Sequence, residues 1–391
     1  MRVLTYSTLF PNRMQPSHGI FVMQRLKQLL ESGLVDAKVV APIPYVPDWI
    51  QVPRKYARYR GIESTEVIRD VQVFHPRYPI VPKVGMSIAP ALLAASTIEL
   101  VRNIRRNDYA FDIIDAHYFY PDGVAAAYIA RRLKIPLVIT ARGTDINLIP
   151  RYRIPRLQIL WAADNADAII TVCDALRQRL IELGVPPEKV RTLRNGVDPK
   201  IFYPADRLEA RRKLDLQRMT LLSVGHLIER KGHHLTIEAL TLLPDVELIL
   251  IGAGPEEQKL RSLAASLGVA DRVRFAGEIA QGGLREYYTA CDATVLASSR
   301  EGMANVLLES LACGCPVVAT DVWGNPEVIS KPAAGTLIQD RSAAGIAGGV
   351  RRLFASPPGR TETLAHSHQF HWHSTTVGQL EIFNELLQTR R

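Results

Sequence analysis

Two glutamates stand on either side of a predicted helix start in the segment EGMANVLLE, which runs from Glu301 to Glu309. A helix that begins near Asn305 leaves its first backbone N–H groups without partners, so the amides of Ala304, Asn305 and Val306 can bind sugar hydroxyls or phosphate oxygens. Glu301, on the preceding loop, can accept hydrogen bonds from the hydroxyls of a sugar, and Glu309 can hold a ribose diol in the same way. The simpler alternative is that Glu309 only complements the helix dipole and that Glu301 is a loop carboxylate.

A pair of cations follows a predicted strand in the segment LSVGHLIERKGHHLTIEAL. The strand ends at Gly225, and a short loop then brings Arg230 and Lys231 to a helix that begins near Gly232. A guanidinium and an ammonium at a helix N-terminus can hold a diphosphate. Two solvated loop cations are the alternative. A nearby G-x-G turn in ILIGAGPEEQKL has Glu257 where a dinucleotide-binding fingerprint needs a third glycine.

The chain has no Asp-x-Asp pair of the kind that could hold a metal ion beside a diphosphate. If a sugar–diphosphate bond breaks here, Arg230, Lys231 and a helix N-terminus must stabilise the leaving phosphate in place of a metal. The histidine-rich segment HSHQFHWH, from His366 to His373, is a weaker candidate for a metal site, because no helical spacing is established there. The sequence therefore predicts no metal and no cofactor.

The charge of the chain is uneven. Of its 48 Lys and Arg and 39 Asp and Glu, residues 1–198 hold 27 and 18, and the remainder is balanced. A basic half suggests an anionic partner, which could be a phosphate-bearing substrate, a membrane surface or nucleic acid, although solubility alone is an equal explanation. No nucleic-acid motif accompanies the charge. We expect no signal peptide in MRVLTYSTLF and no membrane span, since no apolar run reaches about 18 residues. The four cysteines show no disulfide spacing and fit buried thiols in a reducing cytosol.

Short apolar strands alternate with helices along nearly the whole chain, which predicts α/β domains with parallel sheets covered by helices on both faces. The proline- and glycine-containing segment RNGVDPKIFYP, residues 194–204, interrupts the alternation and is predicted to join two such domains. A last amphipathic helix, at about 374–388, has no strand after it and is predicted to cross back onto the first domain. Two doubly wound Rossmann-like domains facing a cleft would place the site between the carboxyl ends of their strands.

Taken together, these features resemble the retaining glycosyltransferases of family 4, which have the GT-B fold. The resemblance covers essentially the whole chain and is carried by Glu301 and Glu309 with LACGCPVVAT after them, by Arg230-Lys231, and by the segments NGVD, DAHYFYPDG and ARGTDIN. Within the family it is nearest to bacterial enzymes that build cell-surface polysaccharides, including the teichuronic-acid type.

The resemblance implies roles for individual residues. Arg230 and Lys231 should bind the donor diphosphate and stabilise the leaving group, with Gly225 before them. Glu309 should bind the nucleotide ribose, and Glu301 the donor sugar, with the amides of residues 304–306 beside it.

In the first domain, the resemblance makes His117 the cleft histidine that contacts the donor sugar near the reacting carbon. We expect Asp145 and His117 to position the acceptor, although His117 could instead be a structural histidine at a strand end. Gly19, in PSHGIFV, takes the place of the family's first glycine loop near the phosphates. Many members have two glycines there and this chain has one.

The predicted domains are residues 1–197, joined by the helix at 372–391, on the acceptor side, and residues 198–371 on the donor side. The expected enzyme is a metal-independent, retaining hexosyltransferase. It would move a sugar from a nucleotide-diphosphate sugar, such as a UDP-sugar, to a saccharide or a lipid-diphosphate-linked acceptor, in polysaccharide or exopolysaccharide biosynthesis. It would work in the cytoplasm, with a peripheral contact between its basic domain and the inner face of the membrane. A nucleotide-sugar epimerase of GT-B-like fold and a non-catalytic basic module are the alternatives.

Overall fold

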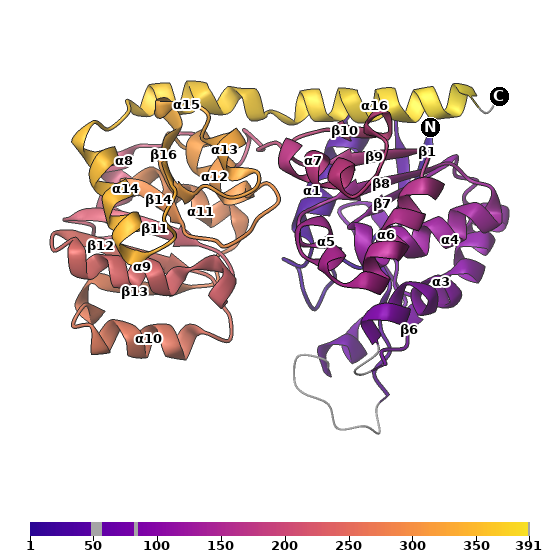
Figure 1. Ribbon diagram of the computed structural model, residues 1–391, viewed down its shortest axis with the longest axis horizontal. Coiled ribbons are helices and arrows are strands. Elements are labelled where there is room, and N and C mark those ends of the chain that lie inside the picture. The colour runs from indigo at the N-terminus through magenta and orange to yellow at the C-terminus, as the bar shows by residue number, and fades with distance from the viewer. Residues whose placement is uncertain (48–56, 82–84, 390–391) are drawn as a thin grey trace. The chain divides into compact units, whose positions relative to one another are not determined.

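The computed structural model describes residues 1–47, 57–81 and 85–389 (Figure 1). The chain divides into two compact units. Unit 1 consists of Met1–Arg194 and His373–Arg391, and unit 2 is Asn195–Trp372. The predicted cleft between two domains stays a prediction.

Unit 1 contains an eight-stranded sheet with the strand order β10-β9-β8-β7-β1-β2-β5-β4. Its strands are β1 (Arg2–Tyr6), β2 (Asp36–Val40), β4 (Thr65–Ile68), β5 (Val71–Phe74), β7 (Ile113–His117), β8 (Leu137–Ala141), β9 (Ala168–Thr171) and β10 (Val190–Thr192). Seven of them run parallel, and β7 and β8 are buried at every position, as apolar strands between two helical layers should be. A separate parallel pair is formed by β3 (Ile43–Pro44) and β6 (Arg77–Tyr78).

Strand β4 departs from the expected parallel arrangement, because it pairs antiparallel with β5. The two strands are joined by Arg69 and Asp70, whose φ angles are 48° and 65°. Two consecutive residues of positive φ form the tight two-residue turn of a hairpin, which only antiparallel strands can share. This edge of the sheet was therefore not recognised from the sequence, since Arg-Asp is not among the usual dipeptides of such turns.

The helices of unit 1 cover the sheet in layers. They are α1 (Ile20–Glu31), α3 (Gly85–Asn103), α4 (Val124–Leu133), α5 (Thr144–Asn147), α6 (Arg153–Asn165), α7 (Asp174–Glu182) and α16 (Trp372–Thr389). Helix α4 packs between α3 and α6 (Figure 1). The C-terminal helix α16 inserts Leu380, Ile382 and Phe383 into the same apolar core as α1. The core of unit 1 is thus completed by the end of the chain.

Unit 2 contains a six-stranded, fully parallel sheet with the order β13-β12-β11-β14-β15-β16. Its strands are β11 (Met219–Val224), β12 (Val246–Ile251), β13 (Val273–Gly277), β14 (Ala293–Leu296), β15 (Val317–Thr320) and β16 (Gly335–Ile338). Its helices are α8 (Arg207–Lys213), α9 (His233–Ala239), α10 (Glu257–Ser266), α11 (Gln281–Ala290), α12 (Asn305–Ala312), α13 (Asn325–Val328), α14 (Ala343–Ala355) and α15 (Arg360–Ser367).

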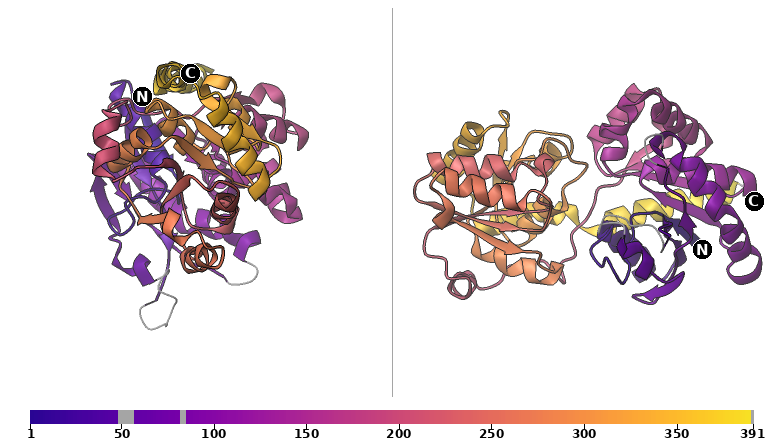
Figure 2. Two further views of the ribbon diagram at one scale, coloured as in Figure 1. Left: turned by 90° about the vertical axis from the view of Figure 1, so that its left-hand side faces the viewer. Right: turned by 90° about the horizontal axis from the view of Figure 1, so that it is seen from below.

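Helices flank this sheet on both sides (Figure 2). Helix α9 packs against α10 and α14, whereas α11 packs against α8 and α12, and α12 against α15. The strand order reverses at β11 and β14, so the loops that follow these two strands diverge to opposite sides of the sheet. In open α/β sheets, ligands bind at the carboxyl ends of strands at such a switch point.

Candidate active site

In unit 2, two cations converge on one carboxylate. The Lys231 ammonium lies 2.7 Å from Oε1 of Glu301, and Nη1 of Arg230 lies 3.2 Å from the same oxygen. The same Arg230 nitrogen also donates to the carbonyl of Arg300 at 2.8 Å. Residues that are 70 positions apart in the sequence are therefore joined at the carboxyl ends of β11 and β14, the switch point of this sheet.

The local backbone explains how the two cations reach this point. After β11, the chain makes a 3₁₀ turn at Glu229–Lys231, and Gly232 then starts α9 with φ of 73°. A Cβ at Gly232 would lie 2.1 Å from the carbonyl oxygen of Ala297, so this loop and the one after β14 approach as closely as glycine permits. The amide of Ser299 also donates to the carbonyl of Arg230 at 2.9 Å.

Glu301 is held in its ionised form. Burial by itself would raise its pKa, but the charges of Lys231 and Arg230 and a hydrogen bond from Lys231 outweigh burial and lower the pKa below its ordinary value. An ionised carboxylate only accepts hydrogen bonds, and each of its oxygens can accept more than one. The ammonium of Lys231 has three N–H donors, and its bond to Glu301 uses one.

Glu309 lies in a different environment from Glu301. It is the fifth residue of α12 and is buried, and it accepts hydrogen bonds from the Tyr288 hydroxyl at 3.0 Å and from the Gln281 amide at 3.4 Å. Burial raises the pKa of Glu309 to about 7, although the two hydrogen bonds oppose this shift. Near neutral pH this carboxyl can therefore change its charge in response to its surroundings.

The N-terminus of α12 carries no side-chain cap, because its N-cap residue is Ala304. Asn305 accepts a hydrogen bond from Asn195 through its side-chain oxygen at 2.9 Å, which ties the start of the helix to the first residue of unit 2. Ala304 is buried, whereas Asn305 and Val306 are partly exposed.

In unit 1, Gly19 is the N-cap of α1 and has φ of 62°. A Cβ there would lie 2.2 Å from the carbonyl carbon and oxygen of Leu9, so only glycine allows the loop after β1 to fold against the start of the helix. The predicted first loop thus leads into α1, a helix of 12 residues whose N-terminus has no side-chain cap.

His117, the last residue of β7, is 1% exposed, and both of its ring nitrogens have partners within unit 1. Nε2 lies 3.1 Å from Oδ2 of Asp115, and Nδ1 lies 2.9 Å from Nη2 of Arg142. Since Arg142 can only donate, Nδ1 accepts and Nε2 carries the proton. Burial and the Arg142 charge lower the pKa of His117, against the opposing effect of Asp115, so the imidazole is neutral. A hydrogen bond from this side chain to a sugar would require one of the two bonds to exchange.

Asp145 is fully buried and organises backbone amides. Its carboxylate accepts hydrogen bonds from the amides of Phe119 at 2.7 Å, Gly143 at 2.7 Å and Arg142 at 3.1 Å. Burial raises its pKa, and these amides oppose that rise. Asp145 therefore fixes the loops after β7 and β8 to one another.

Asp122 has the same function for the loop after β1. It accepts from the amide of Thr8 at 2.9 Å and from the hydroxyls of Thr8 and Ser7 at 3.0 and 3.3 Å. Burial raises its pKa to about 7. Three loops at the carboxyl edge of the sheet are thus held together by two buried carboxyl groups.

A further buried network joins α16 to this edge. The side-chain oxygen of Gln379 accepts from Nε of Arg25 at 2.7 Å, and its nitrogen donates to Oδ2 of Asp115 at 2.8 Å. Arg25 also donates to the carbonyl of Leu193. Because Asp115 bonds to His117, the C-terminal helix supports the predicted cleft histidine through a single intermediate residue.

Several of these residues were not identified from the sequence. Asp115 and Asp122 lie inside the segment DAHYFYPDG, and Arg142 inside ARGTDIN, so those two segments did contain the signal. Tyr288, Gln281 and Gln379 come from helices distant in the sequence, and nothing near them indicated a role.

The other chemical candidates are used for packing. His366 bonds to the carbonyl of Val328 at 2.9 Å and packs edge-on against Phe370, while the rings of His368 and His371 stack at 5.5 Å. Within residues 1–47, 57–81 and 85–389, no three His, Cys, Asp or Glu side chains are grouped so that they could hold a metal ion. The four cysteines are buried and free.

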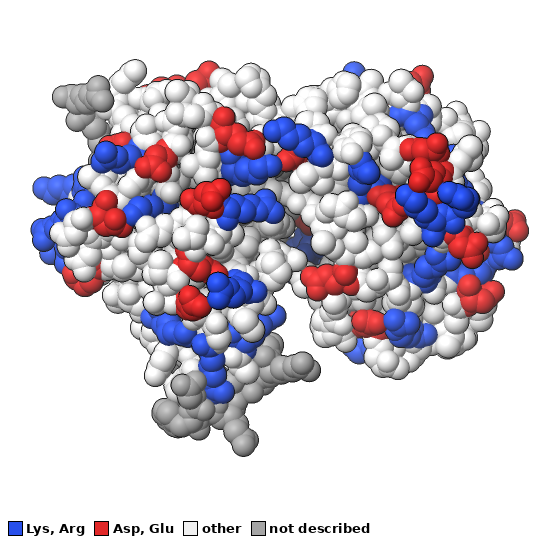
Figure 3. Space-filling model, turned by 180° about the vertical axis from the view of Figure 1, so that it is seen from behind, with Lys and Arg blue, Asp and Glu red and all other residues white. Residues whose placement is uncertain are grey.

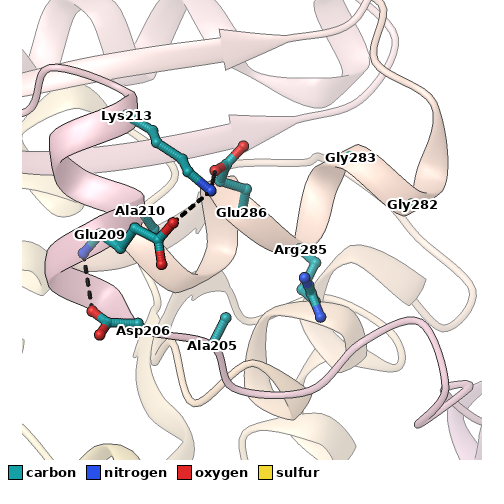
Figure 4. A pocket seen from close by; sticks show the side chains of 9 residues that line it. All are labelled: Ala205, Asp206, Glu209, Ala210, Lys213, Gly282, Gly283, Arg285 and Glu286. Atoms are coloured by element: carbon teal, nitrogen blue, oxygen red, sulfur yellow. Dashed lines mark hydrogen bonds and ion pairs between the residues drawn. The ribbon is translucent and has the colours of Figure 1, made fainter.

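A hollow of about 330 Å³ lies on unit 2 between α8 and α11, and Figure 4 shows its lining. Lys213 pairs there with Glu209 at 2.9 Å and with Glu286 at 3.6 Å, while Arg285 lies apart from them. The charges inside this hollow thus largely satisfy one another. None of the predicted site residues lines it.

Comparison with known families identifies both halves of the chain. Residues 206–367 match the family described as Glycosyl transferases group 1, and residues 47–201 match Glycosyltransferase Family 4. The chain is 32% identical over 335 residues to a D-inositol 3-phosphate glycosyltransferase of Acidothermus cellulolyticus, with 77% of this chain and 73% of the relative aligned. The chain belongs to glycosyltransferase family 4.

Two more comparisons agree with this assignment. A protein of Bacillus subtilis named as a teichuronic acid biosynthesis glycosyltransferase, TuaC, is 27% identical over 359 residues, which cover 90% of this chain and 89% of the relative. The solved structure of Anabaena HepE in complex with UDP superposes with a TM-score of 0.74 at 19% identity, covering 98% of this chain and all of the other. The fold is therefore GT-B, and the family-4 chain is a glycosyltransferase, as the sequence predicted. In the part of the chain that the structure describes, every helix is too short or too polar to cross a membrane.

Proposed function

We propose that this glycosyltransferase transfers a sugar from a UDP-sugar, with retention of configuration and without a metal ion, to a saccharide or lipid-diphosphate-linked acceptor in the synthesis of a cell-surface polysaccharide. The observation that carries the proposal is the convergence of Lys231 and Arg230 on Glu301 at the switch point of the unit 2 sheet. The donor is chosen because Anabaena HepE, a structural neighbour, was solved with UDP. The pathway is chosen because TuaC, a relative, is named for teichuronic acid biosynthesis.

The two cations suit the charge that develops when the sugar–diphosphate bond breaks. The departing diphosphate gains negative charge, and prearranged donors stabilise it without the reorganisation that water would need. Glu301 holds both cations in place before the donor binds, since their distances to its Oε1 are 2.7 and 3.2 Å. We propose that Lys231 and Arg230 bind the diphosphate with their remaining N–H groups, after the loop that follows Gly225.

The remaining polar groups of unit 2 suit the rest of the donor. Glu301, ionised and able only to accept, is proposed to bind hydroxyls of the donor sugar. Glu309 is proposed to bind the ribose diol, with Tyr288 and Gln281 holding its carboxyl in position. The uncapped start of α12 offers amides beside Glu301.

Unit 1 is proposed to hold the acceptor. A cavity of about 150 Å³ lies at the carboxyl ends of β1 and β2 and is lined by residues that include Thr8, Asn12, His18, Tyr59 and Tyr78. Asn12 is 4% exposed, and its side-chain oxygen has no partner among the described residues. Aromatic faces with a few polar groups are suited to a sugar ring. We propose same-face attack by the acceptor hydroxyl, with the leaving phosphate helping to take its proton.

His117 and Asp145 keep their proposed place at this edge of unit 1, and their geometry suggests how they act. Asp145 fixes the loops that follow β7 and β8, and Asp115 and Arg142 fix the neutral ring of His117. We propose that both residues position the acceptor side of the site. Gly19 is proposed to let the start of α1 approach the donor phosphates.

The experiment that tests this function is a panel of nucleotide sugars, assayed by release of the nucleotide with a lipid-diphosphate glycan as acceptor. We expect release with a UDP-sugar in the presence of EDTA, and its loss in Lys231→Ala. Lys259→Ala is the matched control, because Lys259 is an exposed lysine of unit 2 that pairs with Glu256, three residues before it. A requirement for added magnesium or manganese, or full activity in Lys231→Ala, would refute the proposed mechanism.

The epimerase alternative is not retained, because the chain is a glycosyltransferase. The same assay checks this point directly, since an epimerase would convert the donor when no acceptor is present.

A further inference from the structure

The outward side of α6 is apolar where a surface helix is ordinarily polar. Ile154, Leu157 and Trp161 follow one another at positions i, i+3 and i+7, so they lie on one side of the helix. Ile154 is 53% and Leu157 57% exposed. The opposite side of the helix is buried against unit 1 and carries Pro155, Ile159, Ala162 and Ala163. Helix α6 therefore has apolar side chains on both sides, and only one of them serves the core.

Neighbouring residues enlarge this apolar area. Tyr152, immediately before α6, is 50% exposed. Tyr128 of α4 is also exposed, and its ring stacks on that of Trp161 with 4.2 Å between centroids. Single exposed apolar residues are normal on protein surfaces, but a contiguous group of this kind marks a surface that contacts something else.

Cations are interleaved with these apolar residues. Arg151, Arg153 and Arg156 are exposed, and in the described part of the chain none of their guanidinium groups forms an ion pair with a carboxylate. The acid of α6 itself, Asp164, is at the far end of the helix. On the side drawn in Figure 3, Lys and Arg lie among Asp and Glu in both units.

Further cations lie at the other end of this helical layer, where α4 leads into β8. The C-terminal turn of α4 and the residue after it contribute Arg131, Arg132 and Lys134, all of them exposed. Helices α3, α4 and α6 lie next to one another in this layer (Figure 1). The surface made by Tyr128, Trp161 and residues 151–157 is called the α6 face below.

We propose that the α6 face binds the surface of a membrane that contains anionic lipids. Arginines beside tyrosine, tryptophan and aliphatic side chains are the composition of segments that lie in the interface of a bilayer. Lipid phosphates would partner the three arginines, whose aliphatic stems can lie along the apolar side chains. A protein partner fits less well, since three guanidinium groups without partners would be costly to bury in an apolar interface.

The position of the α6 face is consistent with the proposed function. The inference of membrane binding rests on that function only for the reason why the enzyme would bind a membrane. Helix α6 begins after β8, so its first turn lies at the same carboxyl edge of the sheet as His117 and Asp145. Membrane contact at this edge would bring the acceptor side of the enzyme to a lipid-linked acceptor.

The test is flotation of the full chain with phosphatidylcholine vesicles, with and without phosphatidylglycerol, and with no donor or acceptor present. We expect binding only to the anionic vesicles, and weaker binding as salt is added. Arg153→Gln/Arg156→Gln should lower the partition coefficient about thirty-fold, at the usual contribution of a cation near an anionic surface. Ile154→Ser/Leu157→Ser should lower it about ten-fold without changing the charge.

Matched controls come from unit 2. Arg212→Gln/Arg218→Gln removes two exposed cations, and Leu208→Ser/Leu242→Ser removes two exposed leucines, of which Leu208 is 81% exposed. Both control variants should float like the wild type. Retained donor binding and an unchanged melting temperature would show that the α6-face variants are folded.

Equal binding to neutral and anionic vesicles, no flotation of the wild type, or unaltered flotation of both α6-face variants would overturn the inference. It would also be overturned if light scattering showed that these variants dissociate a dimer. The flotation assay contains no substrate, so its result does not depend on sugar transfer. A wild type that floats but is inactive in the nucleotide-release assay would contradict the proposed function and leave this inference standing.

Discussion

The raised pKa of Glu309 leads to a prediction about the pH dependence of donor binding. If the ionised carboxylate accepts both hydroxyls of the ribose, protonation removes acceptor capacity and weakens binding. With a pKa of about 7, the ionised fraction falls roughly ten-fold for each pH unit below neutrality. Affinity for the nucleotide sugar should therefore fall about thirty-fold between about pH 8 and about pH 5.5. An ordinary glutamate would be almost fully ionised over this range and would give nearly no change.

The stability of the fold should change with pH in the opposite direction to donor affinity. A carboxyl group whose pKa is raised in the folded chain binds its proton more tightly there, so its contribution to stability is present at low pH and lost as the pH rises from about 4.5 to about 7. The shift corresponds to about 3 kcal/mol when Glu309 is fully ionised. Glu309→Gln removes this cost, so its melting temperature relative to the wild type should rise with pH over the same range.

The assay is isothermal titration with the nucleotide sugar that binds best in the donor panel. A nucleotide sugar is preferable to the free nucleotide, whose terminal phosphate itself titrates near pH 6. Glu309→Gln is the control for the other groups that titrate in this range, including Asp122, and its affinity should be weak and independent of pH. The reasoning would be refuted by a wild type whose affinity is constant down to about pH 5.5, or by the same slope in Glu309→Gln.

Three further outcomes are expected. Lys231→Ala should lower kcat by about 10²–10³-fold, as loss of one donor to a developing oxyanion does, whereas Lys259→Ala should leave it unchanged in the nucleotide-release assay. Gly232→Ala should lower the melting temperature by several degrees more than Gly268→Ala. Both glycines have positive φ, but of these two only Gly232 would bring a Cβ against a backbone oxygen. Equal decreases in melting temperature, measured by differential scanning fluorimetry, would contradict this. Gln379→Leu should destabilise the chain by about 2–4 kcal/mol, because each of the two buried charged groups that its amide joins loses one hydrogen bond. A melting temperature like that of the wild type would show that the network is not needed for stability.

Much of this architecture could be predicted from the sequence, because its signals are local. Buried strands of β-branched and apolar residues, such as Leu137–Ala141, indicate a parallel sheet covered on both faces. The predicted joining segment was residues 194–204 with the boundary between 197 and 198, and unit 2 begins at Asn195. The junction of Glu301 with α12 was also visible, since helix starts have a local pattern.

The contacts that could not be predicted join residues that are far apart in the sequence. The sequence gives no sign that Gln281 and Tyr288 of α11 would meet Glu309, because an amphipathic helix places several polar residues at equivalent positions. It likewise did not show that Asp115 and Arg142 would occupy both nitrogens of His117. Such contacts are decided by which helices the topology brings together, and no local pattern encodes them.

The helix that completes unit 1 has a consequence for the order of events on the ribosome. Unit 2 is one continuous segment, but the core of unit 1 lacks Leu380, Ile382 and Phe383 until about 190 residues after Arg194 have been added. At common rates of synthesis this delay is about ten to forty seconds. During that time the apolar core of unit 1 stays exposed where α16 will pack, and unit 2, although synthesised later, can finish folding first. A nascent chain stalled before α16 would therefore expose unit 1 to chaperones and proteases while unit 2 stood intact.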